Sequence, residues 1–546
     1  MTAVLGAAAA PRSGGTRQLA GTGALLRLAL RRDRVMTPIW IVVVAGLVLA
    51  MPGSLESVYA TAAERADAME SMNANSSMRA MYGPVYGDSL GALTAWRIGC
   101  FAGVLAAVMS LVIVVRHTRE EEETGRQEML SASMVGRRAP LTAALLAAFV
   151  ANAGAGLLIA VGLAGRGAAG ALALGLGVAG TGMVFAGVAA VAAQLTESTR
   201  LAKGLTAAVL GAAYVLRAAG DSGDAGDTGD AGGTAGSSAA TWLSPLGWQQ
   251  NLRAFTGERW WVLALVGAVI VAQGLAAYEL AGRRDVGMSF LPTRPGPARG
   301  RLATAGALAL RLQRGSVAGW TAGFLLAGLV FGQMASGAAD IVGDNENTRD
   351  IFERMGGQSG LTDAFLATLA GLFGMVAGLY VVASVLRLHG EETSQRAEPV
   401  LAGAVGRLRW AAGHLVIAFG GTVLLMVVCG LGMAVGHGED MGAVLGACLA
   451  QLPAIWVLGG LAVLLVGAYP KAAVASWAVV GTCLAIGWIG PALDLPQAVM
   501  DLSPFGHLPK LPGTAMSWPP LLTLTLLAAV LTAGGLAGLR RRDMIT

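Results

Sequence analysis

Long runs of apolar residues alternate with short polar segments along almost all of this 546-residue chain. A run of about 20 apolar residues is long enough to cross a bilayer as a helix. Twelve runs reach or approach that length: 36–51, 93–115, 141–163, 168–193, 204–219, 261–281, 316–335, 364–386, 411–435, 442–467, 472–490 and 519–539. The pattern therefore predicts an all-α integral membrane protein with twelve transmembrane helices, six on each side of a basic linker.

The composition excludes a soluble protein. Hydrophobic residues make up 55% of the chain and charged residues 13%, whereas soluble domains contain about 25% charged residues. So few charges cannot cover the surface of a soluble fold. The net charge of +5 could suggest a nucleic-acid partner, but the positions of the charges assign them to membrane topology instead.

Basic residues gather on one side of the predicted membrane. If both termini are cytoplasmic, 28 of the 38 Lys and Arg residues lie on the cytoplasmic side, with only 13 of the 33 Asp and Glu residues. This asymmetry is what the positive-inside rule requires. It predicts a multi-pass protein whose N- and C-termini are both cytoplasmic.

The polar segments divide the chain into five parts. We predict a cytoplasmic tail with an interfacial helix at 1–35, a first transmembrane domain at 36–281, and a basic cytoplasmic linker with a second interfacial helix at 282–315. A second transmembrane domain follows at 316–539 and a short tail at 540–546. The basic residues before the first and seventh runs fit an interfacial helix, but charges that only set topology would look the same.

The two halves of the chain resemble each other. Residues 121–137 match residues 391–407 at a constant offset of 270, with eight of seventeen positions identical. Arg283-Arg284-Asp285 recurs as Arg541-Arg542-Asp543, and Ser244-Pro245 as Ser503-Pro504. Because each half contains an even number of runs, both copies enter the membrane in the same orientation. The sequence thus predicts two tandem, parallel repeats of six helices.

The repeated loop carries the same charges in both copies. They are Glu121, Glu122, Arg126, Glu128 and Arg137 in the first copy, and Glu391, Glu392, Arg396, Glu398 and Arg407 in the second. The spacing of Glu122 and Arg126, and of Glu392 and Arg396, predicts an ion pair on one helical turn. A charged run alone is typical of a solvated helix. Because these charges recur at one offset, we interpret the loops as a docking surface for a soluble partner.

Candidate groups for chemistry are few, and we predict no catalytic, cofactor or metal site in this chain. A phosphate-binding P-loop needs a Lys in the pattern G-x-x-x-x-G-K-[ST]. The three lysines, Lys203, Lys471 and Lys510, stand in other contexts. If ATP and Mg²⁺ drive this protein, a separate chain must bind them.

Ionisable residues are placed outside the middle of the predicted spans. Arg97, Arg217 and Asp363 fall at span ends, and Asp221 falls in a segment, 220–236, that is typical of a flexible loop. Carriers coupled to protons or sodium usually need an acid or a His deep in the membrane. The pattern counts against a proton-coupled secondary carrier, which remains the alternative function.

Small-residue pairs at helical spacing recur inside the spans. They are Gly319/Gly323, Gly374/Gly378, Gly432/Gly436 and Gly442/Gly446. Such pairs let two helix backbones approach closely, and we interpret all four as packing sites.

The chain resembles the large, duplicated permeases of ABC-2 type exporters in actinobacteria, above all the polyketide-antibiotic (tetronasin-resistance type) exporter permeases. The likeness rests on the six-plus-six layout, the paired charged loops and the Arg-Arg-Asp segments. It implies that each half is one ABC-2 type transmembrane domain. It also implies that the loop after each second span is a coupling helix, and that the ten repeated loop charges contact a separate ABC ATPase, two copies per permease.

The resemblance further implies a function. The chain would be the permease subunit of an ATP-driven exporter in the bacterial plasma membrane, without enzymatic activity of its own. It would move hydrophobic small molecules, such as polyketide antibiotics or other drugs, out of the cell, with no nucleic-acid partner. The segments before the first and seventh spans would be elbow helices. Thr393 and Gln395 replace Glu123 and Gly125 in the second copy, so the two loops are expected to contact the ATPases differently.

Overall fold

The computed structural model describes residues 18–74, 76–131, 135–222, 238–285, 287–291, 304–335, 361–438, 440–489 and 496–543. The chain divides into two compact units, unit 1 ending at Pro295 and unit 2 starting at Gly296. Over the described residues the fold is helical apart from one isolated bridge between Thr196 and Leu291. In the part of the chain that the structure describes, twelve helices are long and apolar enough to cross a membrane, which confirms the predicted number.

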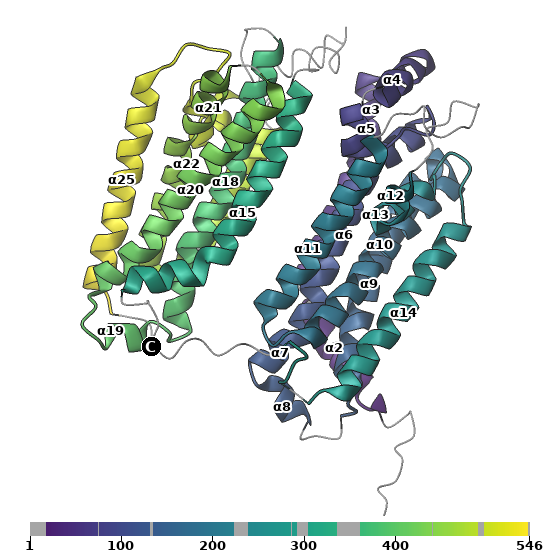
Figure 1. Cartoon of the computed structure of the whole chain (residues 1–546), viewed down its shortest axis with the longest axis horizontal. Helices are drawn as coiled ribbons and strands as arrows, with labels where there is room; N and C mark the ends of the chain where they lie inside the picture. Colours follow the sequence, from purple (N-terminus) through teal and green to yellow (C-terminus); the bar gives the residue numbers. More distant parts are fainter. Residues whose placement is uncertain are drawn as a thin grey trace, which may run out of the picture. The chain divides into compact units, whose positions relative to one another are not determined.

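Unit 1 contains six long helices and several short ones (Figure 1). The long helices are α3 (Met36–Val58), α6 (Leu90–Arg116), α9 (Ala139–Leu163), α10 (Ala168–Leu195), α11 (Thr199–Ser222) and α14 (Trp261–Arg283). The short ones are α2 (Thr22–Arg32), α4 (Ala62–Ala74), α5 (Ser76–Tyr82), α7 (Arg119–Glu123), α8 (Arg126–Ser131), η1 (Ala164–Arg166), α12 (Ala239–Trp242) and α13 (Pro245–Asn251).

Unit 2 follows the same order of long helices. These are α15 (Ala305–Ala335), α18 (Leu361–Thr393), α20 (Arg407–His437), the pair α21 (Met441–Leu449) and α22 (Leu452–Ala468), α23 (Ser476–Ile489) and α25 (Trp518–Arg541). The short elements are α19 (Glu398–Leu401), η2 (Pro470–Ala475), α24 (Gln497–Met500) and η3 (Pro504–His507). Residues 305–315, where a second interfacial helix is expected, form the first part of α15 instead of a separate helix.

Except for α23, which lies inside its predicted run, the long helices extend beyond the apolar runs that predict them, because polar residues at the ends continue or cap a helix. Ser89 caps α6 by accepting a hydrogen bond from the backbone N–H of Ala92, as N-cap residues do. The tenth span is interrupted between Leu449 and Leu452. Pro453 lies in the first turn of α22, where its missing N–H does not disturb the helix.

The structure has two distinct ends within each unit, which we name the base and the distal end. The base of unit 1 carries α7, α8 and the last turn of α14, and its distal end carries α4, α5, α12 and α13 (Figure 1). The base of unit 2 carries α19 and the last turn of α25. Because α25 has 24 residues and a helix rises 1.5 Å per residue, α24 and η3, which precede it, lie at the distal end.

Glycines allow close helix contacts, but only two of the four predicted pairs do so. A Cβ on Gly436 would lie 2.4 Å from the carbonyl oxygen of Leu329 on α15, and one on Gly374 would lie 2.8 Å from Cβ of Gln451. By contrast, no atom of the described residues lies within 4 Å of a Cβ placed at either glycine of the other two pairs, Gly319/Gly323 and Gly442/Gly446. The spacing puts both glycines on one helix face, but it does not determine whether that face meets another helix.

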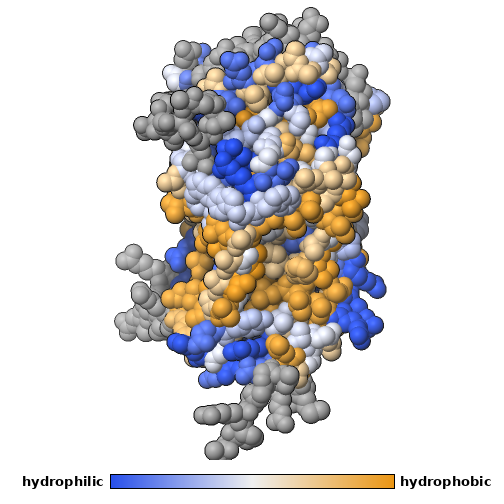
Figure 2. All heavy atoms as spheres, turned by 90° about the vertical axis from the view of Figure 1, so that its right-hand side faces the viewer, coloured by the Kyte–Doolittle hydropathy of each residue, from blue (hydrophilic) through white to orange (hydrophobic). Residues whose placement is uncertain are grey.

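One face of unit 1 is apolar between two polar ends. Figure 2 shows apolar side chains gathered in a belt across this face, with hydrophilic residues above and below it. Helices α9 and α14 carry large hydrophobic side chains that are exposed: Phe149, Leu157, Val161, Trp261, Val271 and Leu275. A soluble protein rarely exposes so large an apolar surface, so the belt fits contact with lipid.

Candidate functional site

The repeated loop of unit 1 lies at the base as two short helices. α7 ends at Glu123 and α8 begins at Arg126, and Gly125 turns the chain between them with φ of +73°. Glycine adopts this left-handed conformation without steric strain. The turn separates Glu122 and Arg126 onto different helices. The predicted ion pair between them is therefore wrong.

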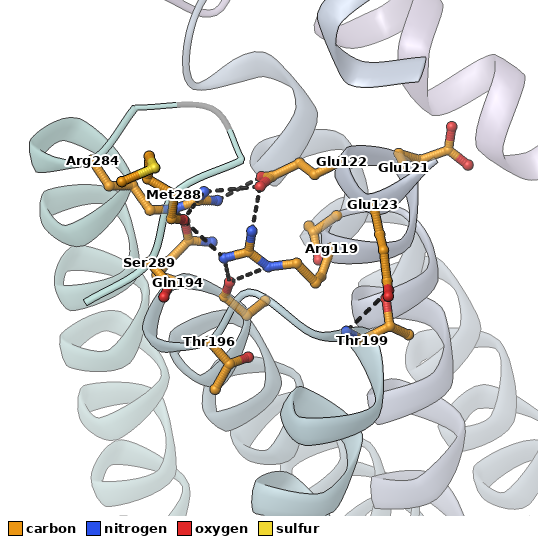
Figure 3. A network of polar contacts seen from close by, with 12 residues as sticks. Arg119, Glu121, Glu122, Glu123, Gln194, Thr196, Thr199, Arg284, Met288 and Ser289 are labelled. Carbon is orange, nitrogen blue, oxygen red and sulfur yellow. Dashed lines mark hydrogen bonds and ion pairs between the residues drawn. The ribbon is translucent and has the colours of Figure 1, made fainter. Parts of the chain in front are cut away.

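Glu122 instead joins two buried arginines (Figure 3). Arg284, at the end of α14, donates from Nη1 to Oε2 at 2.8 Å and from Nη2 to Oε1 at 2.5 Å. Arg119 donates from Nη1 to Oε2 at 2.7 Å. The side chains of Arg119, Glu122 and Arg284 are only 1%, 10% and 8% exposed. A bidentate arginine–carboxylate pair that is largely buried is a strong and directional contact.

Further hydrogen bonds fix this network to the ends of neighbouring helices. Arg119 donates to the carbonyl oxygen of Ala193 on α10, from Nε at 3.0 Å and from Nη2 at 2.7 Å. Arg284 donates from Nε to Oε1 of Gln194 at 2.6 Å. Glu123 accepts a bond from the backbone N–H of Thr199, at the start of α11, at 3.2 Å. The loop is thereby held to α10, α11 and α14 together, as Figure 3 shows.

Unit 2 holds its copy of the loop by the same type of contact. Arg542 donates from Nη1 to Oε1 of Glu392 at 2.5 Å and from Nη2 to Oε2 at 2.6 Å. Arg542 also donates from Nε to the carbonyl oxygen of Gly467, at the end of α22, at 3.0 Å. We call the pairs Glu122–Arg284 and Glu392–Arg542 the base clamps.

The last arginine of each loop supports the same clamp. Arg137 donates from Nη2 to the carbonyl oxygen of Arg284 at 2.5 Å, and Arg407 donates from Nη1 to the carbonyl oxygen of Arg542 at 2.6 Å. Both ends of the repeated loop therefore contact the segment that follows the last long helix of the unit.

The second loop differs from the first in its helices. α18 continues through Glu391 and Glu392 to Thr393, and Gln395 then turns the chain with φ of +58°. Arg396 lies beyond the turn, so the predicted Glu392–Arg396 ion pair is also wrong. Glu391 is paired with Arg387 one turn earlier in α18, at 3.3 Å.

Four of the remaining loop charges are exposed. Arg126 contacts Glu121 at 3.5 Å while its side chain stays 50% exposed, and Glu128, Arg396 and Glu398 are exposed as well. The ten repeated charges thus separate into three groups. Glu122, Arg137, Glu392 and Arg407 belong to the clamps, and Arg126, Glu128, Arg396 and Glu398 form an exposed surface at the base of each unit. Glu121 and Glu391 are paired and largely shielded.

The helix before the first span also contacts the loop of unit 1. Arg32, at the end of α2, pairs with Glu121. Asp33 accepts a 2.6 Å contact from Nε2 of His117 and lies 3.3 Å from Nη1 of Arg116. The sequence does not indicate a role for Arg119 or Asp33, and we did not predict that Arg284 pairs with Glu122 or Arg542 with Glu392. The two ion pairs could have been suspected, because the glutamate and the arginine recur in each half on the same predicted side of the membrane.

A second buried charged network lies at the distal end of unit 1. Asp221 is in the last turn of α11 and 6% exposed, so its assignment to a flexible loop is wrong. Its side chain lies 3.4 Å from Nη1 of Arg217 and accepts a hydrogen bond from Thr241 at 2.8 Å. Residues 223–237, the rest of the predicted loop, lie outside the described residues.

Two comparisons with known proteins, one with family models and one with whole sequences, relate the chain to the same permease. Residues 302–540 match the family described as "Multidrug efflux system permease Rv1217c, C-terminal domain". Over 536 residues the chain is 41% identical to the multidrug efflux system permease protein Rv1217c of Mycobacterium tuberculosis. That alignment covers 96% of this chain and 95% of the relative.

Proposed function

The chain belongs to the family of the multidrug efflux system permease Rv1217c, and we propose that it is the membrane permease of an ATP-driven exporter of the ABC-2 type. In this proposal a separate ABC ATPase, present in two copies, binds ATP and Mg²⁺. The permease supplies the path for a hydrophobic compound and the two loops through which ATP hydrolysis is coupled to transport.

The base clamps are the observation that carries the proposal. In each unit a glutamate of the repeated loop pairs through both oxygens with an arginine at the end of the last long helix. A loop that only connects two spans has no need of such an anchor. A loop that must transmit a push to the helices does need one, because a rigid contact moves the helix ends with the loop.

The clamps also support tandem six-helix repeats. Glu122 and Glu392 are 270 residues apart, Arg284 and Arg542 are 258 apart, and the same two atoms of each side chain meet in both units. Arg137 and Arg407 repeat the pattern. Two units of common origin explain why these contacts recur. We therefore propose that each unit is one ABC-2 type transmembrane domain.

Both bases are proposed to face the cytoplasm. They contain the basic segments that the positive-inside rule places there. In this orientation the exposed loop residues Arg126, Glu128, Arg396 and Glu398 are directed toward soluble ATPase subunits. Lys203 and Glu120, 3.6 Å apart, lie on the same surface of unit 1.

The two docking surfaces are proposed to be unequal. Unit 1 presents α7 and α8 separated by Gly125, and α2 is attached through Arg32 and Glu121. Unit 2 presents the end of α18 followed by α19, whose first turn contains a proline. Two identical ATPases would then meet different surfaces, one on each unit.

The proposed coupling runs through the clamps. When the ATPases close on ATP, they displace the exposed charges of each loop. The clamp transmits this displacement to α14 in unit 1 and to α25 in unit 2, and the network around Arg119 carries it to α10. Movement of these helices opens the path for the compound to the outside. The apolar belt in Figure 2 would let such a compound enter from the bilayer.

The test is purification of the tagged chain from its native host in mild detergent, with mass spectrometry of its partners. The proposal expects a soluble subunit with a P-loop, which is lost when Arg126→Glu and Arg396→Glu are combined. Arg283→Glu is the matched control, because its side chain is also at the base and 68% exposed. Purification of the chain alone, or equal loss of the partner in the control, would contradict the docking role of the loops.

The alternative is a proton-coupled carrier, and one observation gives it a specific candidate. Asp221 is a buried acid within α11, a helix long and apolar enough to span a membrane. A coupling acid must gain and lose a proton during transport. Its contacts with Arg217 and Thr241 favour a fixed charge instead. Transport that persists without ATP and stops on Asp221→Asn would support the carrier.

A further inference from the structure

A basic groove lies along α2 at the base of unit 1. It is open, has a volume of about 610 Å³, and is lined by Gly23, Leu26, Arg27, Leu30, Arg31 and Arg34. Arg27 and Arg31 are four residues apart, so they lie on the same side of α2. Arg34 follows in the turn that leads to α3. Three guanidinium groups therefore border one groove, which we call the α2 groove.

The positive charge of the α2 groove is not neutralised by the part of the chain that the structure describes. The lining contains neither Asp nor Glu. No ion pair joins Arg27, Arg31 or Arg34 to another described residue, and all three are exposed. The groove is thus a site of concentrated positive charge that is open to an anion.

The other two charged residues of the same segment are engaged by the bundle. Arg32 pairs with Glu121 of the repeated loop, and Asp33 contacts Nε2 of His117, at the end of α6, at 2.6 Å. The segment 27–34 therefore divides its charges into one set that ties α2 to unit 1 and another set that borders the groove. Charges that only set the topology need no such division, so the groove set points to a further role.

The α2 helix lies at the depth of the membrane where lipid headgroups are expected. Ala29 is buried in one apolar cluster with Val115, in the last turn of α6, and Leu141, in the first turn of α9. Both helices are long and apolar enough to cross a membrane, and these turns are their base ends. A groove beside them is therefore at the boundary between the hydrocarbon core and the headgroups.

Exposed apolar side chains continue from the α2 groove along α3. Val35, Ile39 and Val42 are all exposed, and they are spaced by four and three residues. Side chains at this spacing share one helix face. An occupant with an anionic head and a hydrocarbon tail would contact the arginines and this face together.

The chemistry of the groove selects a phosphate on an amphiphile. A guanidinium donates two parallel hydrogen bonds to a phosphate group, which makes arginine well suited to bind it. Basic residues beside a membrane surface also attract acidic lipids through their charge. Leu26 and Leu30 in the wall of the groove favour an amphiphile over a free phosphate ion.

We propose that the α2 groove binds the phosphate headgroup of an acidic membrane phospholipid through Arg27, Arg31 and Arg34, with the acyl chains along the exposed face of α3. Because Arg32 of the same helix pairs with Glu121, the bound lipid lies next to the proposed docking surface of unit 1. Binding requires only this chain. It depends neither on the proposed ATPase partner nor on which side of the membrane the base faces.

The test is native mass spectrometry of the purified full-length chain, titrated with dioleoylphosphatidylglycerol. We expect one phosphatidylglycerol to bind more tightly than any further lipid, and dioleoylphosphatidylcholine, whose headgroup has no net charge, to compete weakly. The triple variant Arg27→Gln, Arg31→Gln, Arg34→Gln should weaken this site by about tenfold or more, because each basic residue adds to the attraction. The triple variant Arg27→Lys, Arg31→Lys, Arg34→Lys retains the charge and should retain most of the binding, which separates the loss of charge from a folding defect.

The matched control removes three other exposed arginines at the base: Arg283→Gln, Arg540→Gln and Arg541→Gln. It lowers the net charge by the same amount and should leave the tight site intact. Equal weakening in this control, or equally tight binding of phosphatidylcholine, would overturn the proposal. If the groove instead serves a soluble partner, the triple glutamine variant would lose that partner on purification while its phosphatidylglycerol binding stayed unchanged, which would also overturn it.

Discussion

Glu392 and Arg542 form a bidentate ion pair that joins the end of α18 to the end of α25, with N–O distances of 2.5 and 2.6 Å. These residues are 150 positions apart in the sequence. The Glu392 side chain is 1% exposed and the Arg542 side chain 15%. The contact is therefore largely shielded from water, and it fixes the repeated loop of unit 2 to its last helix.

Removal of one partner should be costly. We expect Arg542→Ala to destabilise unit 2 by about 3 kcal/mol, because it removes a bidentate ion pair from a carboxylate that is almost fully buried. The variant with both charges exchanged, Glu392→Arg with Arg542→Glu, should recover part of this loss. Thermal unfolding of the purified chain in detergent measures both effects. Additive losses in the exchanged variant would show that the two side chains are not coupled.

The contact between α15 and α20 gives a test of helix packing. We expect Gly436→Ala to destabilise the protein by about 1–3 kcal/mol, as overpacking does, because its Cβ would meet backbone atoms of α15 at 2.4 Å and 2.7 Å. Backbone atoms cannot move aside as a flexible side chain can. Gly420→Ala is the control in the same helix, since its Cβ would have no neighbour within 4 Å among the residues that the structure describes. It should be neutral or slightly stabilising, and an equal loss in both variants would contradict the close approach.

The buried network around Asp221 gives a third prediction. Asp221→Asn should lower stability by about 3 kcal/mol, since Arg217, whose side chain is fully buried, loses its counter-charge. Replacing both residues together, Arg217→Met with Asp221→Leu, should be milder because no charge is left unpaired. ATP-dependent transport measured at a temperature where the variant stays folded should persist. Its selective loss would assign Asp221 a role in transport.

The sequence was sufficient to predict the twelve spans and the two repeated loops. Apolar length alone identifies a span, and the 270-residue offset identifies the loops without any structure. Contacts across the chain could not be predicted in the same way. Glu122 was expected to pair with Arg126 four residues away, but Gly125 turns the chain and Arg284, 162 residues away, takes that place.

The end of the fifth span was also predicted incorrectly from the sequence. The apolar run in the fifth span ends near residue 219, yet α11 continues to Ser222 because Asp221 is stabilised there by Arg217 and Thr241. Hydropathy counts an aspartate as polar and ends the run before it. Hydropathy does not account for a charge that is neutralised by a neighbour such as Arg217, one turn away in the same helix.

The most direct test of the central claim is transport by the purified chain, reconstituted into vesicles with the ATPase subunit that copurifies with it. The account predicts that a hydrophobic drug is moved only when ATP is supplied, and that collapse of the proton gradient has no effect. Arg126→Glu with Arg396→Glu should abolish ATP-driven movement while the permease stays folded. Drug movement driven by a proton gradient without ATP, and unaffected by those two substitutions, would contradict the account.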